Sequence, residues 1–185
     1  MVERGATDQP DLGAIFDAHV ACEFDAQDVD ATMATMVAEP YVNHVPTLAG
    51  GVGANEVRRF YGDHFIGQWP DDVAITPVSR TVGANRVVDE MIMKFTHRRV
   101  MDTFLPGVAP TGRPVRLPVV VVMGIDGDKV SYEHIYWDQA SLLVQVGLLD
   151  PALLPVSGVE QAEKLIDIDQ PSNGLIERAG AARGG

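Results

Sequence analysis

The feature that most constrains this sequence is a change of hydrophobic period near residue 73. Before that point, apolar residues recur three and four positions apart; after it, they alternate with polar residues as far as Asp138. The alternating part is divided by short turn sequences such as Asp126-Gly127-Asp128. A helical half followed by strands joined through tight turns predicts an α+β fold.

Three helices are predicted in the first half of the chain. The first covers about residues 11–24, and the second begins after Asp28. We expect Glu39-Pro40 to end the second helix, because proline disfavours the helical conformation of the residue before it. A glycine-rich loop, Tyr41–Gly53, then leads to a third helix over about residues 54–65.

The second half predicts a meander of antiparallel strands. The expected strands are residues 73–82, 86–96, 115–125 and 129–138, with residues 101–105 continuing the second strand beyond a bulge. A short helix at 141–146 ends at Gly147. We therefore predict one domain over residues 1–149. We predict that residues 150–185 form an extension, with one helical patch at 159–168, that wraps the core or a partner subunit and is disordered from 178 onward.

Composition excludes several classes of partner. The net charge of −12 would repel phosphate backbones and anionic lipid, so neither nucleic acid nor a membrane is an expected partner. No apolar run approaches the roughly 20 residues of a membrane helix. The start of the chain lacks the apolar segment of a secretory signal, and the single cysteine excludes an internal disulfide. These features predict a cytoplasmic globular protein.

Asp89 is the first candidate for chemistry. It shares one face of the strand at 86–96 with Val87, Met91 and Met93, so a carboxylate stands on an otherwise apolar face. Burial would raise its pKa, which suits general acid or base catalysis. The competing interpretation is an ion pair with a buried arginine or a hydrogen bond to the backbone, and the sequence leaves the two open.

The last strand supplies a second set of candidates. Tyr132, His134, Tyr136 and Asp138 share one face, while Ser131, Glu133, Ile135 and Trp137 share the other. Such a row could place proton-transfer groups along one wall of a cavity, and His134 is the favoured catalyst. Asp138 has an alternative role as the cap of the following helix. Tyr136 and Trp137 are expected in the pocket wall or the core.

Three further residues are predicted to bind substrate. Tyr41 and His44 lie in the loop after the second helix, where the mouth of a pocket is expected, and His64 ends the third helix. No pair of histidines has metal-ligand spacing and no glycine motif fits a nucleotide, so neither metal nor cofactor is predicted.

Four short stretches together resemble a SnoaL-like member of the nuclear-transport-factor-two-like superfamily. They are FTHRRVMDTFLPGVAPTGRPV at 95–115, DGDKVSYEH at 126–134, the closing Asp138, and LLVQVG at 142–147, after a helical N-terminal half. The resemblance implies a cone, in which a curved antiparallel sheet wraps around the three N-terminal helices and encloses a deep apolar pocket. It also implies homodimers that pack sheet to sheet.

One departure from the cyclases of this family concerns the site. Their acid/base aspartate, which follows the hairpin, corresponds to Ile135 or Tyr136 here, and their histidine on the preceding strand falls near Val120. The cyclase residue set is therefore not carried over, and the expected base is Asp89 or His134.

The function expected from residues and resemblance is cofactor-independent acid/base chemistry on a small or medium apolar carbonyl compound. Cyclisation, isomerisation, dehydration and hydrolysis all remain open. Asp89 or His134 would move the proton, and Tyr136 or His44 would hydrogen-bond the developing oxyanion. The alternative is a non-catalytic module on the same fold that binds a small molecule or serves in assembly.

Overall fold

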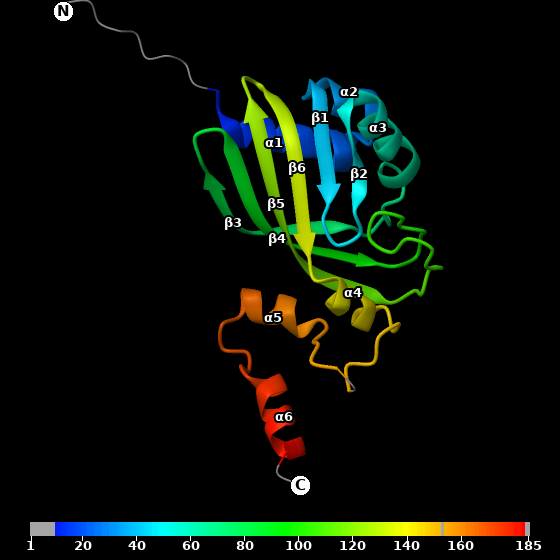
Figure 1. Cartoon of the computed structure of the whole chain (residues 1–185), viewed down its shortest axis with the longest axis vertical. Helices are drawn as coiled ribbons and strands as arrows, with labels where there is room; N and C mark the ends of the chain where they lie inside the picture. The colour runs from blue at the N-terminus through cyan, green and yellow to red at the C-terminus, as the bar shows by residue number, and fades with distance from the viewer. Residues whose placement is uncertain (1–9, 153, 184–185) are drawn as a thin grey trace, which may run out of the picture.

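The computed structural model, which describes residues 10–152 and 154–183, shows a curved six-stranded sheet with helices against one face (Figure 1). The strand order is β2-β1-β6-β5-β4-β3, and every neighbouring pair is antiparallel except β1 and β6. The strands are β1 (Met36–His44), β2 (Ala49–Val52), β3 (Ala74–Val82), β4 (Arg86–Thr96), β5 (Pro114–Asp126) and β6 (Lys129–Trp137).

The N-terminal helices lie against the inner face of this sheet. α1 (Leu12–Ala21) crosses behind the strands in Figure 1, and α2 (Val29–Ala34) and α3 (Gly53–Phe60) lie beside β1 and β2. α1 continues into a π-helical turn, η1 (Cys22–Ala26), and α3 into a second, η2 (Tyr61–Phe65). The carboxylates of Asp11 and Asp28 cap α1 and α2 by accepting hydrogen bonds from Ala14 N and Ala31 N.

The core fills the space between the helices and the inner face of the sheet. Alternate residues of each long strand point inward, as the period of two requires. These include Met91, Met93 and Phe95 on β4, and Val115, Leu117 and Val119 on β5. An aromatic cluster closes the helical side: Phe24, Phe60, Phe65, Trp69, Phe104 and Trp137.

The predicted α+β class and the meander β3–β6 are confirmed, and β4 has the predicted bounds. The N-terminal half differs, because β1 and β2 occupy residues assigned to the end of a helix and to a loop. Pro40, taken as a helix terminator, lies inside β1. The pairing of β1 with β6 shifts register between Met36 and Tyr41, so the missing N–H of proline falls at an irregularity of the ladder.

Residues 101–105 form turns and do not extend β4. Leu105 N donates to Met101 O at 2.8 Å, which closes a helical-type turn. Met101, Phe104 and Leu105 are all buried there, so this segment is apolar because it packs on the core and not because it is a strand.

The C-terminal segments continue from β6. α4 (Gln139–Gln145) is followed by Gly147, whose φ of +79° suits glycine. α5 (Glu160–Ile166) packs against β5, with Ala162 fully buried, and Ser141 Oγ of α4 donates to Gly158 O, just before α5, at 2.8 Å. α6 (Gly174–Arg183) is helical, and the disorder predicted from residue 178 stays a prediction; residues 184–185 lie outside the described residues.

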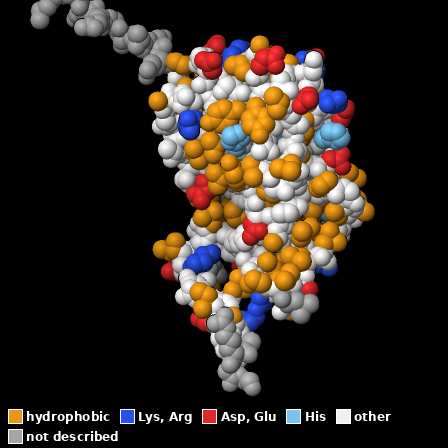
Figure 2. Space-filling model, in the orientation of Figure 1, with side chains coloured by type: hydrophobic (Ala, Val, Ile, Leu, Met, Phe, Trp, Pro, Cys, Tyr) orange, Lys and Arg blue, Asp and Glu red, His pale blue; other side chains and the backbone are white. Residues whose placement is uncertain are grey.

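The division of the chain into a domain and an extension that contacts a partner stays a prediction. Within residues 10–152 and 154–183, every helix is too short or too polar to span a bilayer. The expected homodimer also stays a prediction. Figure 2 shows hydrophobic side chains gathered over the outer face of the sheet, on which Tyr41 and Tyr136 are exposed.

Candidate functional site

A cavity of about 50 Å³ lies between the first helical segment and the inner face of the sheet. Most of its wall is apolar. The polar members of that wall are Glu23, His44 and Glu133, which come from η1, β1 and β6. The apolar lining residues are Phe16, Val20, Phe24, Phe65, Trp69, Ile75, Met91, Met93, Phe104, Val119, Val121 and Ile135. Two carboxylates and an imidazole in such a wall are costly unless partners stabilise them.

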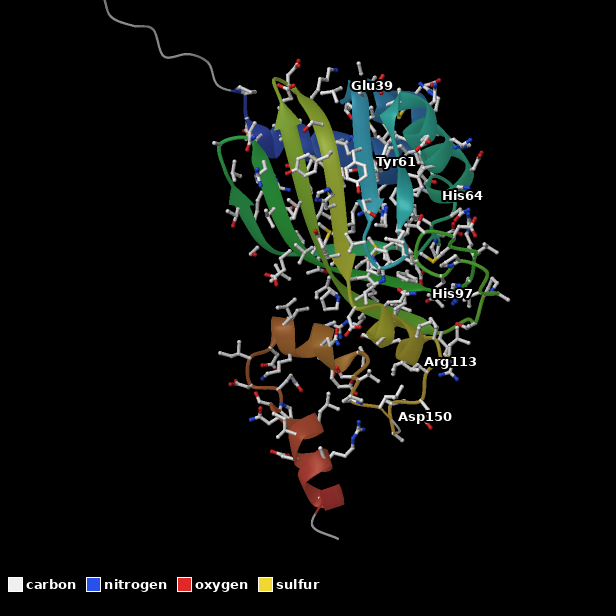
Figure 3. All side chains as sticks on the ribbon, in the orientation of Figure 1. Glu39, Tyr61, His64, His97, Arg113 and Asp150 are labelled. Atoms are coloured by element: carbon white, nitrogen blue, oxygen red, sulfur yellow. The ribbon has the colours of Figure 1, made fainter. Side chains whose placement is uncertain are left out.

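Four buried side chains form a cluster at this wall, which we call the acid–imidazole cluster: His19, Glu23, Tyr61 and Glu133. His19 and Glu23 stand four residues apart, which brings them to the same side of the helix. Glu23 lies in η1 and Tyr61 begins η2, so each π-helical turn supplies one member. Such turns occur often at functional sites because they re-aim a side chain. In Figure 3, Tyr61 is labelled close to β1 and β2.

Hydrogen bonds fix the proton on one nitrogen of His19. Its Nδ1 lies 2.5 Å from Thr35 Oγ1, and the Thr35 hydroxyl donates its own proton to Thr32 O at 2.6 Å. That hydroxyl can therefore only accept from His19, so Nδ1 carries a proton. The other nitrogen, Nε2, faces Tyr61 Oη at 3.3 Å and one carboxylate oxygen each of Glu23 and Glu133, both at 3.4 Å.

The pKa values of His19 and Glu133 move in opposite directions. Burial alone would lower the pKa of His19, but the charges of Glu133 and Glu23 raise it well above its ordinary value. Burial would likewise raise the pKa of Glu133, but the His19 charge and the hydrogen bonds from His19 and Tyr61 lower it. Tyr61 Oη donates to Glu133 Oε2 at 2.7 Å. The pair is therefore an imidazolium beside a carboxylate.

Glu23 behaves differently from Glu133. Its burial, followed by repulsion from Glu133, raises its pKa, although His19 partly offsets both effects. Two carboxyl groups around one imidazole thus differ in their tendency to hold a proton, and both border the cavity. In enzymes, divergent environments of this kind often distinguish a general base from a general acid.

His44 is the third polar group of the wall and is neutral. Its Nδ1 lies 3.3 Å from Ala49 O. Burial lowers its pKa to about 4, an effect that Glu133 and the bond to Ala49 only partly offset. Aromatic rings surround it: Phe60, Phe65, Phe104 and Trp137 have ring centroids 5.3–6.3 Å away.

The cluster also has the donor set of a metal site. One ligand atom each of His19, Glu23 and Glu133 lies within 4.8 Å of the others, and all three side chains are buried. The two distances from His19 Nε2, to Glu23 Oε1 and to Glu133 Oε2, are both 3.4 Å, which is close to the edge of a tetrahedron of ligands at roughly 2.1 Å from a metal. A divalent cation would have to displace the proton from His19 Nε2 and any proton on Glu23, since metal ligands must be deprotonated.

The predicted base Asp89 is buried on the inner face of β4, but it does not border the cavity. Arg80 donates to both of its carboxylate oxygens at 2.7 Å, and the same guanidinium reaches Asp17 on α1. The guanidinium also lies 4.8 Å above the Phe16 ring. The structure therefore shows an ion pair between Asp89 and an arginine, which was the alternative to a catalytic role in the sequence analysis.

The predicted row on β6 lies on the face opposite the cavity. Glu133, Ile135 and Trp137 point inward, whereas Tyr132, His134 and Tyr136 point outward. His134 lies among outer-face aromatic rings, 5.4 Å from Tyr41 and 4.8 Å from Tyr132. The expectation that this row lines the pocket is wrong, because the apolar alternation of Ile135 and Trp137 marks the inner face.

The remaining predicted residues are scattered. Asp138 caps α4, with Oδ1 accepting from Ala140 N at 2.8 Å and from Ser141 N at 3.2 Å. Trp137 stacks on Phe104 at 4.3 Å in the core. His64, in η2, is partly exposed and pairs with Asp102 at 3.1 Å; Figure 3 labels it on the helical side, away from the long strands. Among the predicted site residues, only His44 borders the cavity.

The sequence did contain a signal for Glu133. It is a carboxylate on the same strand face as Ile135 and Trp137, which is the argument that selected Asp89 on β4. The positions of Glu23 and Tyr61 had no comparable signal, because each depends on a π-helical turn that the pattern of apolar residues does not reveal.

Comparison with known proteins agrees with this architecture. The sequence profile of the SnoaL-like domain matches residues 16–133, which is more than half of the chain. Among curated proteins no match was found. A putative SnoaL-like polyketide cyclase from Jannaschia sp. CCS1 is similar in structure, at 16% identity and a TM-score of 0.57, covering 78% of this chain and 100% of that one.

Two further solved structures share the fold. A hypothetical protein with a ketosteroid isomerase-like fold from Catenulispora acidiphila DSM 44928, in complex with trimethylamine, gives 16% identity, a TM-score of 0.56 and coverage of 76% and 95%. The epoxide hydrolase/cyclase-like enzyme SalBIII gives 15% identity and a TM-score of 0.50, covering 68% of this chain and 89% of that one. Identities this low establish the fold alone. Together with the profile match, they confirm the family predicted from the sequence: this chain belongs to the SnoaL-like domain family.

Proposed function

We propose that this protein is an enzyme that transfers a proton at the carbon beside a carbonyl group, with Glu133 as the base and Glu23 as the acid. The observation that carries the proposal is the divergence of two buried carboxyl groups that share one imidazole and one cavity. The SnoaL-like family and the cyclase and epoxide hydrolase/cyclase-like neighbours support acid/base chemistry on carbonyl or oxygenated compounds.

The proposed step is an enolisation. Glu133 takes a proton from the α-carbon, the electron pair of that C–H bond moves into the carbonyl, and the oxygen gains negative charge. Protonated Glu23 donates a hydrogen bond to that oxygen, which stabilises the charge as it develops. Return of the proton to another carbon completes an isomerisation; attack by the enolate carbon on a second carbonyl would complete a cyclisation.

His19 and Tyr61 are positioning residues in this scheme. Tyr61 holds Oε2 of Glu133, which leaves Oε1 for the substrate. The imidazolium of His19 keeps Glu133 ionised in an apolar wall where burial alone would favour the protonated form. Thr35 in turn fixes the ring of His19.

The test is deuterium incorporation into small ketones in D2O, followed by proton NMR over a panel that includes 2-pentanone and cyclopentanone. We expect the wild-type protein to accelerate exchange at the α-carbon of at least one ketone. Glu133→Gln removes the base but keeps the shape, and should lower that rate at least 100-fold. Absence of exchange for every ketone would refute the proposal.

A chelator distinguishes acid/base chemistry from metal chemistry at the same cluster. The proposal predicts the same exchange rate with and without EDTA, and no stoichiometric metal in the purified protein. Loss of exchange on chelation, restored by a divalent cation, would replace the proposed mechanism with a metal-assisted one.

The second candidate function is a module that binds a small molecule without catalysis. It is favoured by the small size of the cavity, about 50 Å³, and by hydrogen bonds that already satisfy Tyr61 and His19 within the protein. Ketone binding detected by NMR without any α-carbon exchange would select this function.

A further inference from the structure

His44 stands out in the cavity wall because its free nitrogen can only accept a hydrogen bond. The group beside its Nδ1 is a backbone carbonyl, Ala49 O at 3.3 Å. A carbonyl oxygen has no proton to give, so Nδ1 must be the donor. A neutral imidazole carries one N–H, and Nε2 is therefore left with a lone pair.

The ring stays neutral because of where it lies. His44 is 3% exposed and is surrounded by aromatic rings, and burial lowers its pKa to about 4. Glu133 lies near enough to oppose this effect, yet does not reverse it. At neutral pH, His44 therefore cannot donate to an oxyanion from Nε2, which was the role first expected for it.

His44 and Glu133 are neighbours on the cavity wall. β1 pairs in parallel with β6, with His44 opposite Ile135 and Val42 opposite Glu133. Both side chains point inward and border the cavity. Diagonal neighbours on one sheet face have Cβ atoms roughly 7–8 Å apart, so one small molecule can contact both side chains.

We infer that His44 accepts a hydrogen bond from a hydroxyl group of the substrate, so that the cavity selects small hydroxy ketones over ketones without a hydroxyl. The inference rests on the proposed function, because Glu133 and Glu23 would act on the carbonyl end of the same molecule. A β-hydroxy ketone places its hydroxyl one carbon beyond the reacting α-carbon, on the side away from the carbonyl.

The rest of the wall favours this assignment. Beyond Glu23, His44 and Glu133, the lining side chains are hydrophobic. A ketone that lacks the hydroxyl would leave Nε2 of His44 without a donor, and a buried acceptor without a partner weakens binding. A site built around such a group rejects the analogue that lacks the matching donor.

The test compares two molecules of nearly equal shape, 4-hydroxy-2-butanone and 2-pentanone, in which a hydroxyl replaces a methyl group. Dissociation constants are measured at pH 7 by NMR titration of the wild-type protein. We expect the hydroxy ketone to bind about 5- to 20-fold more tightly. Equal binding, or no binding of the hydroxy ketone, would overturn the inference.

Three variants locate the hydrogen bond. His44→Phe keeps an aromatic ring without the acceptor and should abolish the preference. His44→Gln returns an acceptor oxygen and should retain part of it, and Glu133→Gln should leave the preference intact. Loss of the preference in Glu133→Gln but not in His44→Phe would place the hydroxyl on the glutamate and overturn the assignment.

Binding also separates this inference from the proposed function. A preference for the hydroxy ketone that depends on His44, found together with no α-carbon exchange, supports the hydroxyl site and refutes proton transfer. If exchange depends on Glu133 but the protein binds both ketones with the same affinity, proton transfer is supported and the hydroxyl site is refuted.

Discussion

Asp89 and Glu133 are both buried carboxylates on the inner face of the sheet, yet their partners give them different chemistry. Arg80 binds both oxygens of Asp89 at 2.7 Å. A guanidinium does not release its proton in proteins, so this pair is a fixed charge pair. Glu133 is paired with His19 and Tyr61, both of which can exchange protons, and one side of it borders the cavity.

The difference shows that a carboxylate on an apolar strand face is not by itself a sign of catalysis. Burial makes an ionised carboxylate costly at both Asp89 and Glu133. The partner then determines whether the carboxylate is held in a fixed ion pair or can exchange a proton.

Removing the imidazole from the acid–imidazole cluster should give the largest effect on stability. His19→Leu leaves Glu23 and Glu133 buried without a cation, and we expect the free energy of unfolding to fall by about 3–5 kcal/mol at pH 7. Urea denaturation followed by circular dichroism measures the change. Combining His19→Leu with Glu23→Leu and Glu133→Met should recover much of the loss, since these replacements remove the imidazole and both carboxyl groups of the cluster; no recovery would contradict the account of the cluster.

His44 should make the stability depend on pH in the acid range. Its pKa is about 4 in the folded protein, against about 6.5 when unfolded, so the unfolded state binds more protons between these values. The stabilisation is complete above about pH 6.5 and is lost as pH falls toward 4, by about 3 kcal/mol in total. The slope of unfolding free energy against pH should therefore be shallower in His44→Phe, and identical slopes would contradict this assignment.

Breaking the Asp89 pair should cost less than breaking the cluster. Arg80 is one-third exposed, so water can partly solvate the carboxylate that Arg80→Met leaves behind. We expect a loss of about 1–2 kcal/mol in urea denaturation and no change in the rate of ketone exchange. An exchange rate that falls with this variant would bring Asp89 back into the catalytic site.

The outer face of β6 should be the least sensitive region for the stability of the single chain. Tyr136→Ser removes a side chain that is 43% exposed, and the expected change in unfolding free energy is within about 0.5 kcal/mol. The same face is where the predicted homodimer would form. Light scattering of Tyr136→Glu should give a lower molar mass than the wild type if that dimer exists; an unchanged dimer mass would exclude this face as the interface.

The sequence predicted most of the fold because the strands of the meander alternate strictly. In β4 and β6, the tight turns and the period-two pattern together determine where the strands begin and end. β1 was missed because Pro40 resembles a helix terminator, and a parallel partner more than 90 residues away has no local signal. Alternation also defined two faces of β6 without stating which one is inside.

The site was predicted less well than the fold because it depends on contacts between distant segments. Glu133 acquires its low pKa from His19, which lies 114 positions earlier in the chain, and Tyr61 is aimed at Glu133 by a π-helical turn. His44 was selected because the loop at 41–53 was expected to form the mouth of a pocket. The proposal of an acid/base role for the cluster required the three-dimensional structure.

The most direct test of the contrast between the two carboxylates is the rate of α-carbon exchange in Glu133→Gln and Asp89→Asn, measured side by side on the best ketone for the wild type. Both substitutions replace a buried carboxylate with an amide of the same shape. The account predicts a fall of at least 100-fold for Glu133→Gln and less than 3-fold for Asp89→Asn in the folded protein. The reverse order of effects would show that Asp89 is the base and that the cluster around His19 is structural.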